Sequence, residues 1–185
     1  MMKATAPIVP GFRWPVGVSR PIAAPSTRIW EVISSPSALA LFHPFCAKNP
    51  VIDWPGPSSH DEVHYFNGLV LVRHFSDWYE DLGYDLEIGK VGGRTSAVSW
   101  RIKPVDDHRG SIEITVFPHW LQTIPAIIRW IPHLVRLRPQ LRAYLRSVVE
   151  GLDWFITHDQ SVKRNQFGSH QWFSPPAPAN RGEEA

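Results

Sequence analysis

The amino-acid sequence predicts an α+β domain in which a curved antiparallel sheet of about six or seven strands wraps around one long C-terminal helix. Three observations support this fold class. Two short helix patterns follow the first strand pattern, a run of extended segments then alternates apolar and polar residues, and a helix pattern of about 20 residues comes last. A chain of 185 residues is long enough for one such domain with its own core.

The first strand is expected over residues 16–23, and two short helices are expected directly after it. Ser26 and Thr27 are typical of a helix start, because their hydroxyls can accept a hydrogen bond from an unpaired N–H of the first turn. Pro36 separates this helix from a second short one that continues through Phe42. Pro44 ends the second helix, because proline disfavours helical geometry in the residue before it.

Extended segments follow, and the clearest of them predict a sheet with one buried and one wet face. In the segment 95–103, an apolar set alternates with a polar set. The apolar set is Val98, Trp100 and Ile102, and the polar set is Ser99, Arg101 and Lys103. Asn67-Gly68, between two extended segments, is a strong hairpin signal. The expected strands cover residues 51–54, 63–66, 69–78, 84–88, 95–103 and 111–117.

The last helix begins at Pro139, where the missing N–H of proline costs little. It is expected to be roughly 30 Å long, and it alone is long enough to cover the apolar face of the sheet. Its apolar face consists of Leu141, Tyr144, Leu145, Val148, Leu152 and Phe155. Because a strongly curved sheet cannot close on a single helix everywhere, we expect an apolar pocket between them, and such pockets usually bind small molecules.

We expect an irregular N-terminal arm over residues 1–15 and a domain over residues 16–160. A helical segment over residues 121–137 is expected as an insertion in this domain. Residues 161–185 form a C-terminal extension whose last, proline-rich residues we expect to be disordered.

The segment SRPIAAPSTRIWEVISSPSAL resembles the N-terminal pattern of the SRPBCC superfamily, with matches at Ala24, Pro25, Trp30, Ser35 and Pro36. This helix-grip group includes START lipid-transfer domains, birch-pollen-allergen-like proteins and polyketide cyclases/dehydratases. The segments FHPFCAKNPVIDWPG, GYDLEIG and NQFGSHQWF are similar to those of an uncharacterised bacterial branch. The resemblance implies a helix-grip fold and a pocket for lipids, sterols, polyketides or plant hormones, and in a minority of members cyclisation or dehydration.

Three functional hypotheses follow. The first is a protein that binds or carries a small hydrophobic ligand, such as a lipid, a polyketide or an aromatic compound. The second is a cyclase/dehydratase-type enzyme that uses His43, Arg73 or Tyr65 to polarise a carbonyl or move a proton. The expected pocket walls are Tyr65, Val98, Trp100, Ile114, Tyr144 and Val148, with His43 and Arg73 as polar anchors.

The third hypothesis is a peripheral membrane or interaction module. Between residues 121 and 149 there are five arginines and no acidic residue. The basic surface over residues 121–146 would make the contact, and its part over residues 121–137 is expected to be a helix that extends the core, or a lid over the pocket that rests on an anionic membrane. Trp154 lies off the apolar face of the last helix, so it is expected either to pack under the C-terminal segment or to make a homodimer contact.

Arg73 and His74 interrupt an apolar strand, so one of them must lie on its inner face. A buried charge requires a partner. Two alternatives follow for a buried Arg73: an ion pair with an acidic residue of the 77–87 stretch, or an anchor for a ligand carboxylate or carbonyl.

We expect no metal and no cofactor. His60 and His64 would lie about 13 Å apart on a strand, too far to share one ion. The single cysteine, Cys46, excludes an intramolecular disulfide, cannot hold an iron–sulfur cluster and is typical of a cytoplasmic protein. A formal net charge of +2 is too small to indicate nucleic-acid binding.

Overall fold

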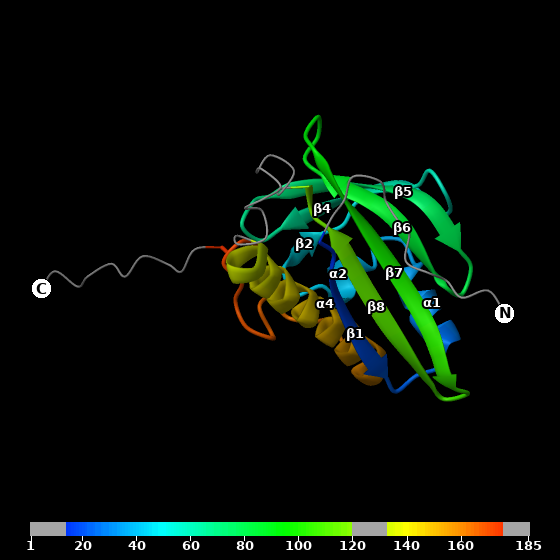
Figure 1. Ribbon diagram of the computed structural model, residues 1–185. Helices are drawn as coiled ribbons and strands as arrows, with labels where there is room; N and C mark the ends of the chain where they lie inside the picture. The colour runs from blue at the N-terminus through cyan, green and yellow to red at the C-terminus, as the bar shows by residue number, and fades with distance from the viewer. Residues whose placement is uncertain (1–13, 120–132, 176–185) are drawn as a thin grey trace, which may run out of the picture.

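One antiparallel sheet of eight strands curves around the helix α4 (Arg138–His158) (Figure 1). The computed structural model describes residues 14–119 and 133–175. The order across the sheet is β1-β8-β7-β6-β5-β4-β2, and β3 also pairs with β4. The strands are β1 (Val16–Ile22), β2 (Cys46–Lys48), β3 (Val51–Asp53), β4 (His60–Tyr65), β5 (Val70–Tyr79), β6 (Gly83–Gly89), β7 (Thr95–Asp106) and β8 (Arg109–Phe117).

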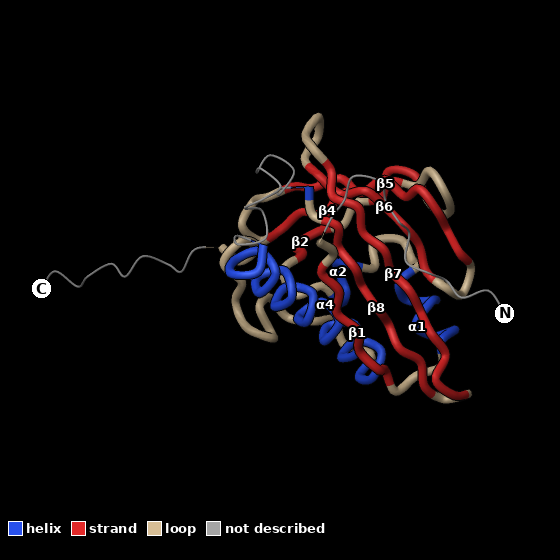
Figure 2. The backbone as a smooth tube through the Cα atoms, viewed as in Figure 1, coloured by secondary structure: helices blue, strands red, loops and turns tan. Residues whose placement is uncertain are grey.

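The helices lie together on one side of the sheet (Figure 2). Besides α4 they are α1 (Ser26–Ile33), α2 (Leu39–Phe42) and a π-helical turn, η2 (His133–Leu137), that leads into α4. Helix α1 turns its apolar residues inward, and α4 runs beside β1, to which it is tied by an ion pair from Arg20 to Asp153. Within the described residues, no helix is long and apolar enough to cross a membrane.

This architecture confirms the predicted fold class, with one difference in the strand count. The sheet contains eight strands instead of six or seven, and β2 is the strand that the sequence analysis did not identify. Only three residues long, β2 is too short to show an alternating pattern. The predicted hairpin is present between β4 and β5, where Gly68 has a positive φ of 85° and the Leu69 N–H donates to the Asn67 side chain at 3.0 Å.

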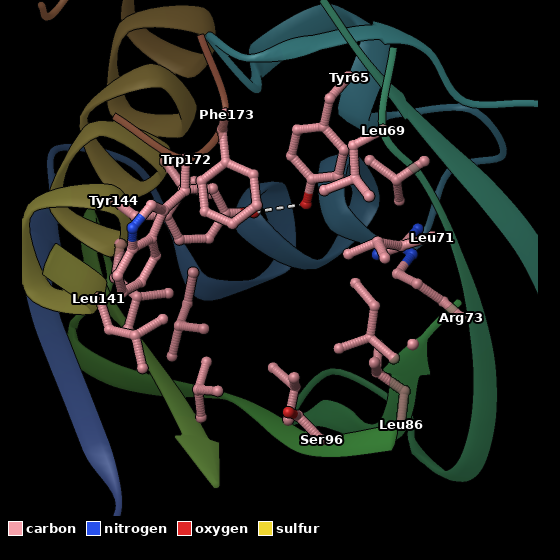
Figure 3. Close-up of a pocket in the computed structure, with 18 of the residues that line it drawn as sticks. Tyr65, Leu69, Leu71, Arg73, Leu86, Ser96, Leu141, Tyr144, Trp172 and Phe173 are labelled. Atoms are coloured by element: carbon pink, nitrogen blue, oxygen red, sulfur yellow. Dashed lines mark hydrogen bonds between the residues drawn. The ribbon is translucent and has the colours of Figure 1, made fainter. Parts of the chain in front are cut away.

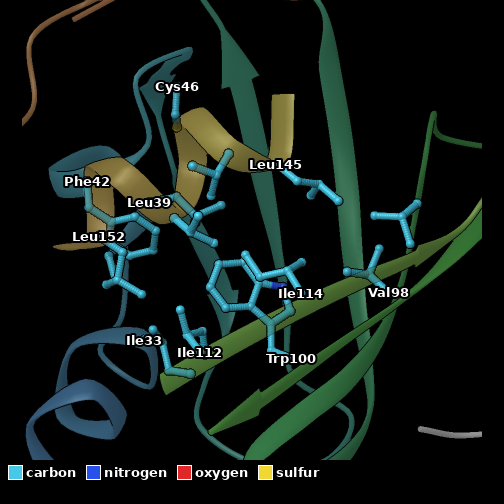
Figure 4. Close-up of a cluster of buried hydrophobic side chains, with 14 of the residues drawn as sticks. Ile33, Leu39, Phe42, Cys46, Val98, Trp100, Ile112, Ile114, Leu145 and Leu152 are labelled. Carbon is cyan, nitrogen blue, oxygen red and sulfur yellow. The ribbon is translucent and has the colours of Figure 1, made fainter. Parts of the chain in front are cut away.

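The core is continuous from the helices to the middle of the sheet (Figure 4). Trp100 and Ile114 project from β7 and β8 toward Leu145 and Leu152 of α4. At Gly151, an added Cβ would lie 2.0 Å from the carbonyl oxygen of Phe42. The glycine therefore permits a close approach of α4 to the end of α2, and this approach fixes the position of the residues that follow α2.

The outer face of β7 corrects the expectation of a uniformly wet face. Lys103 is exposed, but Ser99 and Arg101 are buried. Arg101 donates to the Asp85 carboxylate at 2.6 Å, and its guanidinium lies 4.8 Å from the centre of the Tyr79 ring. The alternating pattern indicated the outward direction of these side chains correctly, but it carried no information on the ion pair that buries Arg101.

Candidate functional site

A cavity of about 470 Å³ lies between the sheet and α4 (Figure 3). Most of its wall is apolar, with side chains from β4 to β8, α4 and the segment after α4. Leu71 and Leu86 face Leu141 across it, and Ile88 and Leu145 also line it. This cavity is where the sheet and the single long helix fail to close on each other, as the sequence analysis expected.

The structure places all eight sequence-predicted site residues on the wall of this cavity. They are His43, Tyr65, Arg73, Val98, Trp100, Ile114, Tyr144 and Val148. Their placement brings them around one space, and contact with a ligand stays a prediction.

Three polar side chains meet at one end of the cavity. Tyr144 of α4 has its hydroxyl 2.8 Å from Nε2 of His43 and 2.9 Å from the hydroxyl of Tyr65, which comes from β4. His43 lies directly after α2, and its Nδ1 accepts a hydrogen bond from the Phe45 N–H at 3.2 Å. We refer to His43, Tyr65 and Tyr144 as the His–Tyr–Tyr cluster.

Burial keeps the His–Tyr–Tyr cluster uncharged. It lowers the pKa of His43 to about 3, and the nearby positive charge of Arg73 acts in the same direction. Burial also raises the pKa of Tyr65 and Tyr144 well above the usual value for a phenol. At neutral pH the cluster therefore consists of a neutral imidazole and two neutral phenols, which bind through hydrogen bonds and not through charge.

Arg73 faces inward and His74 faces solvent, which settles the orientation that the sequence left open. The Arg73 guanidinium donates to both carboxylate oxygens of Asp61, through Nε at 2.7 Å and through Nη2. Asn49 donates a further hydrogen bond to Asp61 at 3.0 Å. Both members of the ion pair are buried.

The ion-pair partner of Arg73 corrects one prediction. The expected partner was an acidic residue of the 77–87 stretch, whereas the structure pairs Arg73 with Asp61. In the register of β4 and β5, Asp61 lies directly opposite Arg73. Asp61 lies on a different strand from Arg73, so the residue pattern of β5 alone cannot identify it, and only the pairing of β4 with β5 does.

The segment after α4 supplies a part of the site that the sequence analysis did not assign. The Phe173 ring stacks on Tyr65 with a centroid distance of 4.8 Å and lies 4.4 Å from the Tyr144 ring. The backbone carbonyl of Trp172 accepts a hydrogen bond from Asn67 at 2.8 Å. The aromatic residues of NQFGSHQWF were a signal for this, but no periodicity connected them to the sheet.

Another part of the cavity wall carries basic residues. Lys90 and Arg94, from the turn between β6 and β7, line it together with Ser96 and His119, whose side chains lie 2.8 Å apart. No Asp or Glu belongs to the wall, as far as residues 14–119 and 133–175 describe it.

Two other predictions can be compared with the structure only in part. The lid predicted over residues 121–137 lies outside the described residues up to position 132. Trp154 is half-buried and stacks on His158, with ring centroids 3.9 Å apart, while its packing under the C-terminal segment or at a homodimer contact stays a prediction. In the part of the chain that the structure describes, no three His, Cys, Asp or Glu side chains gather as a metal site requires.

Comparisons with known proteins show the fold. No protein-family model and no curated protein matches the chain. Among solved structures, DynU16, a protein of the dynemicin biosynthetic locus, is similar with a TM-score of 0.61 and 14% identity, over 80% of this chain and 48% of that one. The chain thus spans about half the length of DynU16.

Two further solved structures are similar to this chain over nearly the whole of their own length. Truncated norcoclaurine synthase from Thalictrum flavum gives a TM-score of 0.56 and 14% identity, over 78% of this chain and 94% of that one. A protein from Thermobifida fusca gives a TM-score of 0.58 and 13% identity, over 81% of this chain and 97% of that one. DynU16 and norcoclaurine synthase have helix-grip folds, and the chain described here has the same fold.

The buried ion pair leads to a stability prediction. Arg73→Met should lower the free energy of unfolding by about 3–5 kcal/mol, because it leaves the Asp61 carboxylate buried without a counter-charge. The double variant Asp61→Leu/Arg73→Met should lose less than the sum of the two single variants. Urea denaturation measures all four proteins. As a control, Lys103→Met breaks the exposed pair with Glu113 and should cost less than about 1 kcal/mol; an equal loss at Arg73 would contradict the prediction.

The lowered pKa of His43 leads to a pH prediction. In the unfolded chain a histidine binds its proton near pH 6.5, whereas in the folded protein His43 binds it near pH 3. Between these values the unfolded state binds more protons, so stability falls as the pH falls. At pH 5 the loss from this one group should be about 2 kcal/mol relative to neutral pH.

The variant His43→Gln should lack this part of the pH dependence, and His108→Gln, which removes an exposed histidine, should keep it. Urea denaturation at several pH values between 7 and 5 measures the difference before most carboxylates titrate. Parallel pH profiles for the wild type and His43→Gln would show that His43 is not buried in its neutral form.

Proposed function

We propose that this protein binds and carries a small hydrophobic ligand in the cavity between the sheet and α4. The observation that carries this proposal is the cavity itself, about 470 Å³ in volume and lined mainly by apolar side chains. Its size and lining are those of small-molecule sites in proteins. Protein interiors normally leave few voids larger than a water molecule, so a space of this size inside the fold suits a ligand.

The helix-grip fold supports the proposal without identifying the ligand. The neighbours with this fold include a protein of the dynemicin biosynthetic locus and a norcoclaurine synthase. Together with the matches at Ala24, Pro25 and Trp30, this likeness supports placing the chain in the SRPBCC superfamily, whose members hold lipids, sterols or polyketides in the equivalent pocket.

A cyclase/dehydratase-type enzyme is the second candidate function. The observation in its favour is the His–Tyr–Tyr cluster, because three groups that can hydrogen-bond to a carbonyl converge at one end of the cavity. Cyclisation or dehydration also requires a group that takes a proton. Among the described wall residues there is no carboxylate, and Nδ1 of His43 already accepts the Phe45 N–H, so binding has the stronger support.

A change that fills the cavity should abolish binding of a neutral hydrophobic probe. Leu71 lines the cavity and is only half-buried, so Leu71→Trp should place its larger ring in the space at little cost to packing. Val70 is its neighbour on the exposed side of the same strand, which makes Val70→Trp the matched control. Titration with N-phenyl-1-naphthylamine, followed by fluorescence, should show at least a tenfold loss of affinity for Leu71→Trp alone.

Native mass spectrometry of the protein as purified, with organic extraction, complements this titration. If the wild type binds neither the probe nor any extracted compound, or if both tryptophan variants lose affinity equally, the proposed function is wrong.

The two candidate functions predict different results for 2-acetonaphthone, a ketone with exchangeable methyl hydrogens. Because no carboxylate lines the described wall and Nδ1 of His43 is already engaged by the Phe45 N–H, we expect the protein not to accelerate exchange of these hydrogens in D₂O, as followed by proton NMR. Acceleration in the wild type that disappears in Tyr144→Phe would instead favour an enzyme that polarises and deprotonates a carbonyl compound.

A further inference from the structure

The His–Tyr–Tyr cluster has a fixed direction of hydrogen bonding. Nδ1 of His43 accepts the Phe45 N–H, so the proton of the neutral imidazole is on Nε2. The Nε2–H therefore donates to the Tyr144 hydroxyl, 2.8 Å away. The Tyr144 oxygen acts as an acceptor toward His43, and its own proton must point elsewhere.

The cluster holds one more donor proton than it can use internally. Its three groups carry three protons, one on Nε2 and one on each phenol, and they form two hydrogen bonds. If Tyr144 donates to Tyr65, the Tyr65 proton is left over; if Tyr65 donates to Tyr144, the Tyr144 proton is left over. Neither hydroxyl has another partner within the described chain. A buried O–H without an acceptor is unfavourable by about 1–3 kcal/mol.

The cavity is the space into which the remaining proton can point. Tyr65 and Tyr144 both line it, and Figure 3 shows their hydroxyls approaching each other at one end of it. The rings are held in place, because Phe173 stacks on Tyr65 and Phe45 stacks on Tyr144 with centroids 5.8 Å apart. The donor is therefore preorganised for an acceptor atom on a molecule in the cavity.

The electrostatics of this end favour an uncharged acceptor. On the wall, Arg73 uses Nε and Nη2 on Asp61, so its charge is balanced within the protein. The basic residues Lys90 and Arg94 line the cavity but belong to the turn between β6 and β7 and not to the cluster. A carboxylate in contact with the two phenols would be buried without a counter-charge of its own.

We propose that the cavity takes ligands with a neutral carbonyl oxygen, and that the Tyr65–Tyr144 hydroxyl pair donates the hydrogen bond that recognises this oxygen. The inference rests on the proposed function and names the class of ligand for the same site: a neutral ketone, ester or lactone on an apolar body. His43 acts as a positioning residue, because its Nε2–H fixes the direction in which the hydroxyl pair donates.

The test compares three probes of one shape in competition with N-phenyl-1-naphthylamine. 2-Acetonaphthone carries a carbonyl, 2-isopropenylnaphthalene replaces the oxygen by a methylene group, and 2-naphthoate is the anion. We expect the wild type to bind the ketone roughly fivefold to tenfold more tightly than the isopropenyl compound, the effect of about one net hydrogen bond. It should also bind the ketone more tightly than 2-naphthoate.

The tyrosine variants distinguish a shared donor from a single one. Tyr65→Phe and Tyr144→Phe should each retain most of the preference for the ketone, since the remaining phenol can still donate to it. The double variant is made in a His43→Leu background, because loss of Tyr144 would otherwise leave the Nε2–H of His43 as a donor at the same place; it should bind both neutral probes with similar affinity. Tyr79→Phe removes a hydroxyl on the outer face of the sheet and should bind like the wild type. Thermal unfolding of each variant checks that it is folded.

An infrared measurement reports on the same hydrogen bond directly. The stretching frequency of a ¹³C-labelled carbonyl in bound 2-acetonaphthone should be lower in the wild type than in the double variant, and His43→Gln should broaden or shift this band. The frequency depends on the bond to the oxygen and not on how well the variant packs.

The outcomes separate the inference from the proposed function. If both neutral probes bind equally to the wild type, or if 2-naphthoate binds most tightly, the cavity binds ligands but the inference is wrong. If the double variant keeps the full preference for the ketone, another group recognises the carbonyl. If no probe displaces N-phenyl-1-naphthylamine and none binds, the proposed function fails and the inference fails with it.

Discussion

The ion pair between Asp61 and Arg73 is the interaction on which the arrangement of the site depends. It joins β4 to β5 across directly opposed residues. Asn49 binds Asp61 and also accepts the N–H of Leu39, the first residue of α2. This buried chain of polar contacts connects the two strands to the helix that leads into His43. The charge of Arg73 can be buried beside an apolar cavity because the protein supplies Asp61 as its counter-charge and Asn49 as a further hydrogen-bond donor to Asp61.

Because of the ion pair, the cavity wall has uncharged hydrogen-bond donors in one place and basic side chains in another. With Arg73 balanced by Asp61, the inner wall presents hydrogen-bond donors without net charge, while the basic residues lie at the turn between β6 and β7. A molecule in the cavity would therefore meet a polar but neutral contact at one end and an apolar surface along most of its length. Such an arrangement selects by shape and by the position of one acceptor.

The sequence predicted the fold class, the two short helices, the long helix and the hairpin at Asn67-Gly68, because each has a local signal in composition or period. It predicted the apolar wall residues for the same reason, since inward strand positions follow from alternation and the apolar face of α4 follows from the helical period. It could not predict the partner of Arg73, which depends on strand register, or the burial of Arg101, which depends on a pairing across strands. The contribution of Phe173 was also inaccessible, because an irregular segment has no period that points inward.

Part of the cavity wall comes from the irregular segment after α4, and this has a consequence for how the pocket can diverge between homologues. Phe173 and Trp172 reach the cavity from a segment that pairs with no strand of the sheet and is attached through single contacts such as the one to Asn67. Substitutions on β7 or α4 alter the packing of the core along with the pocket, whereas substitutions here change the pocket while leaving every strand pair intact. Changes in ligand range can therefore arise in this segment without altering the pairing of the sheet, although Phe173 itself belongs to the buried core.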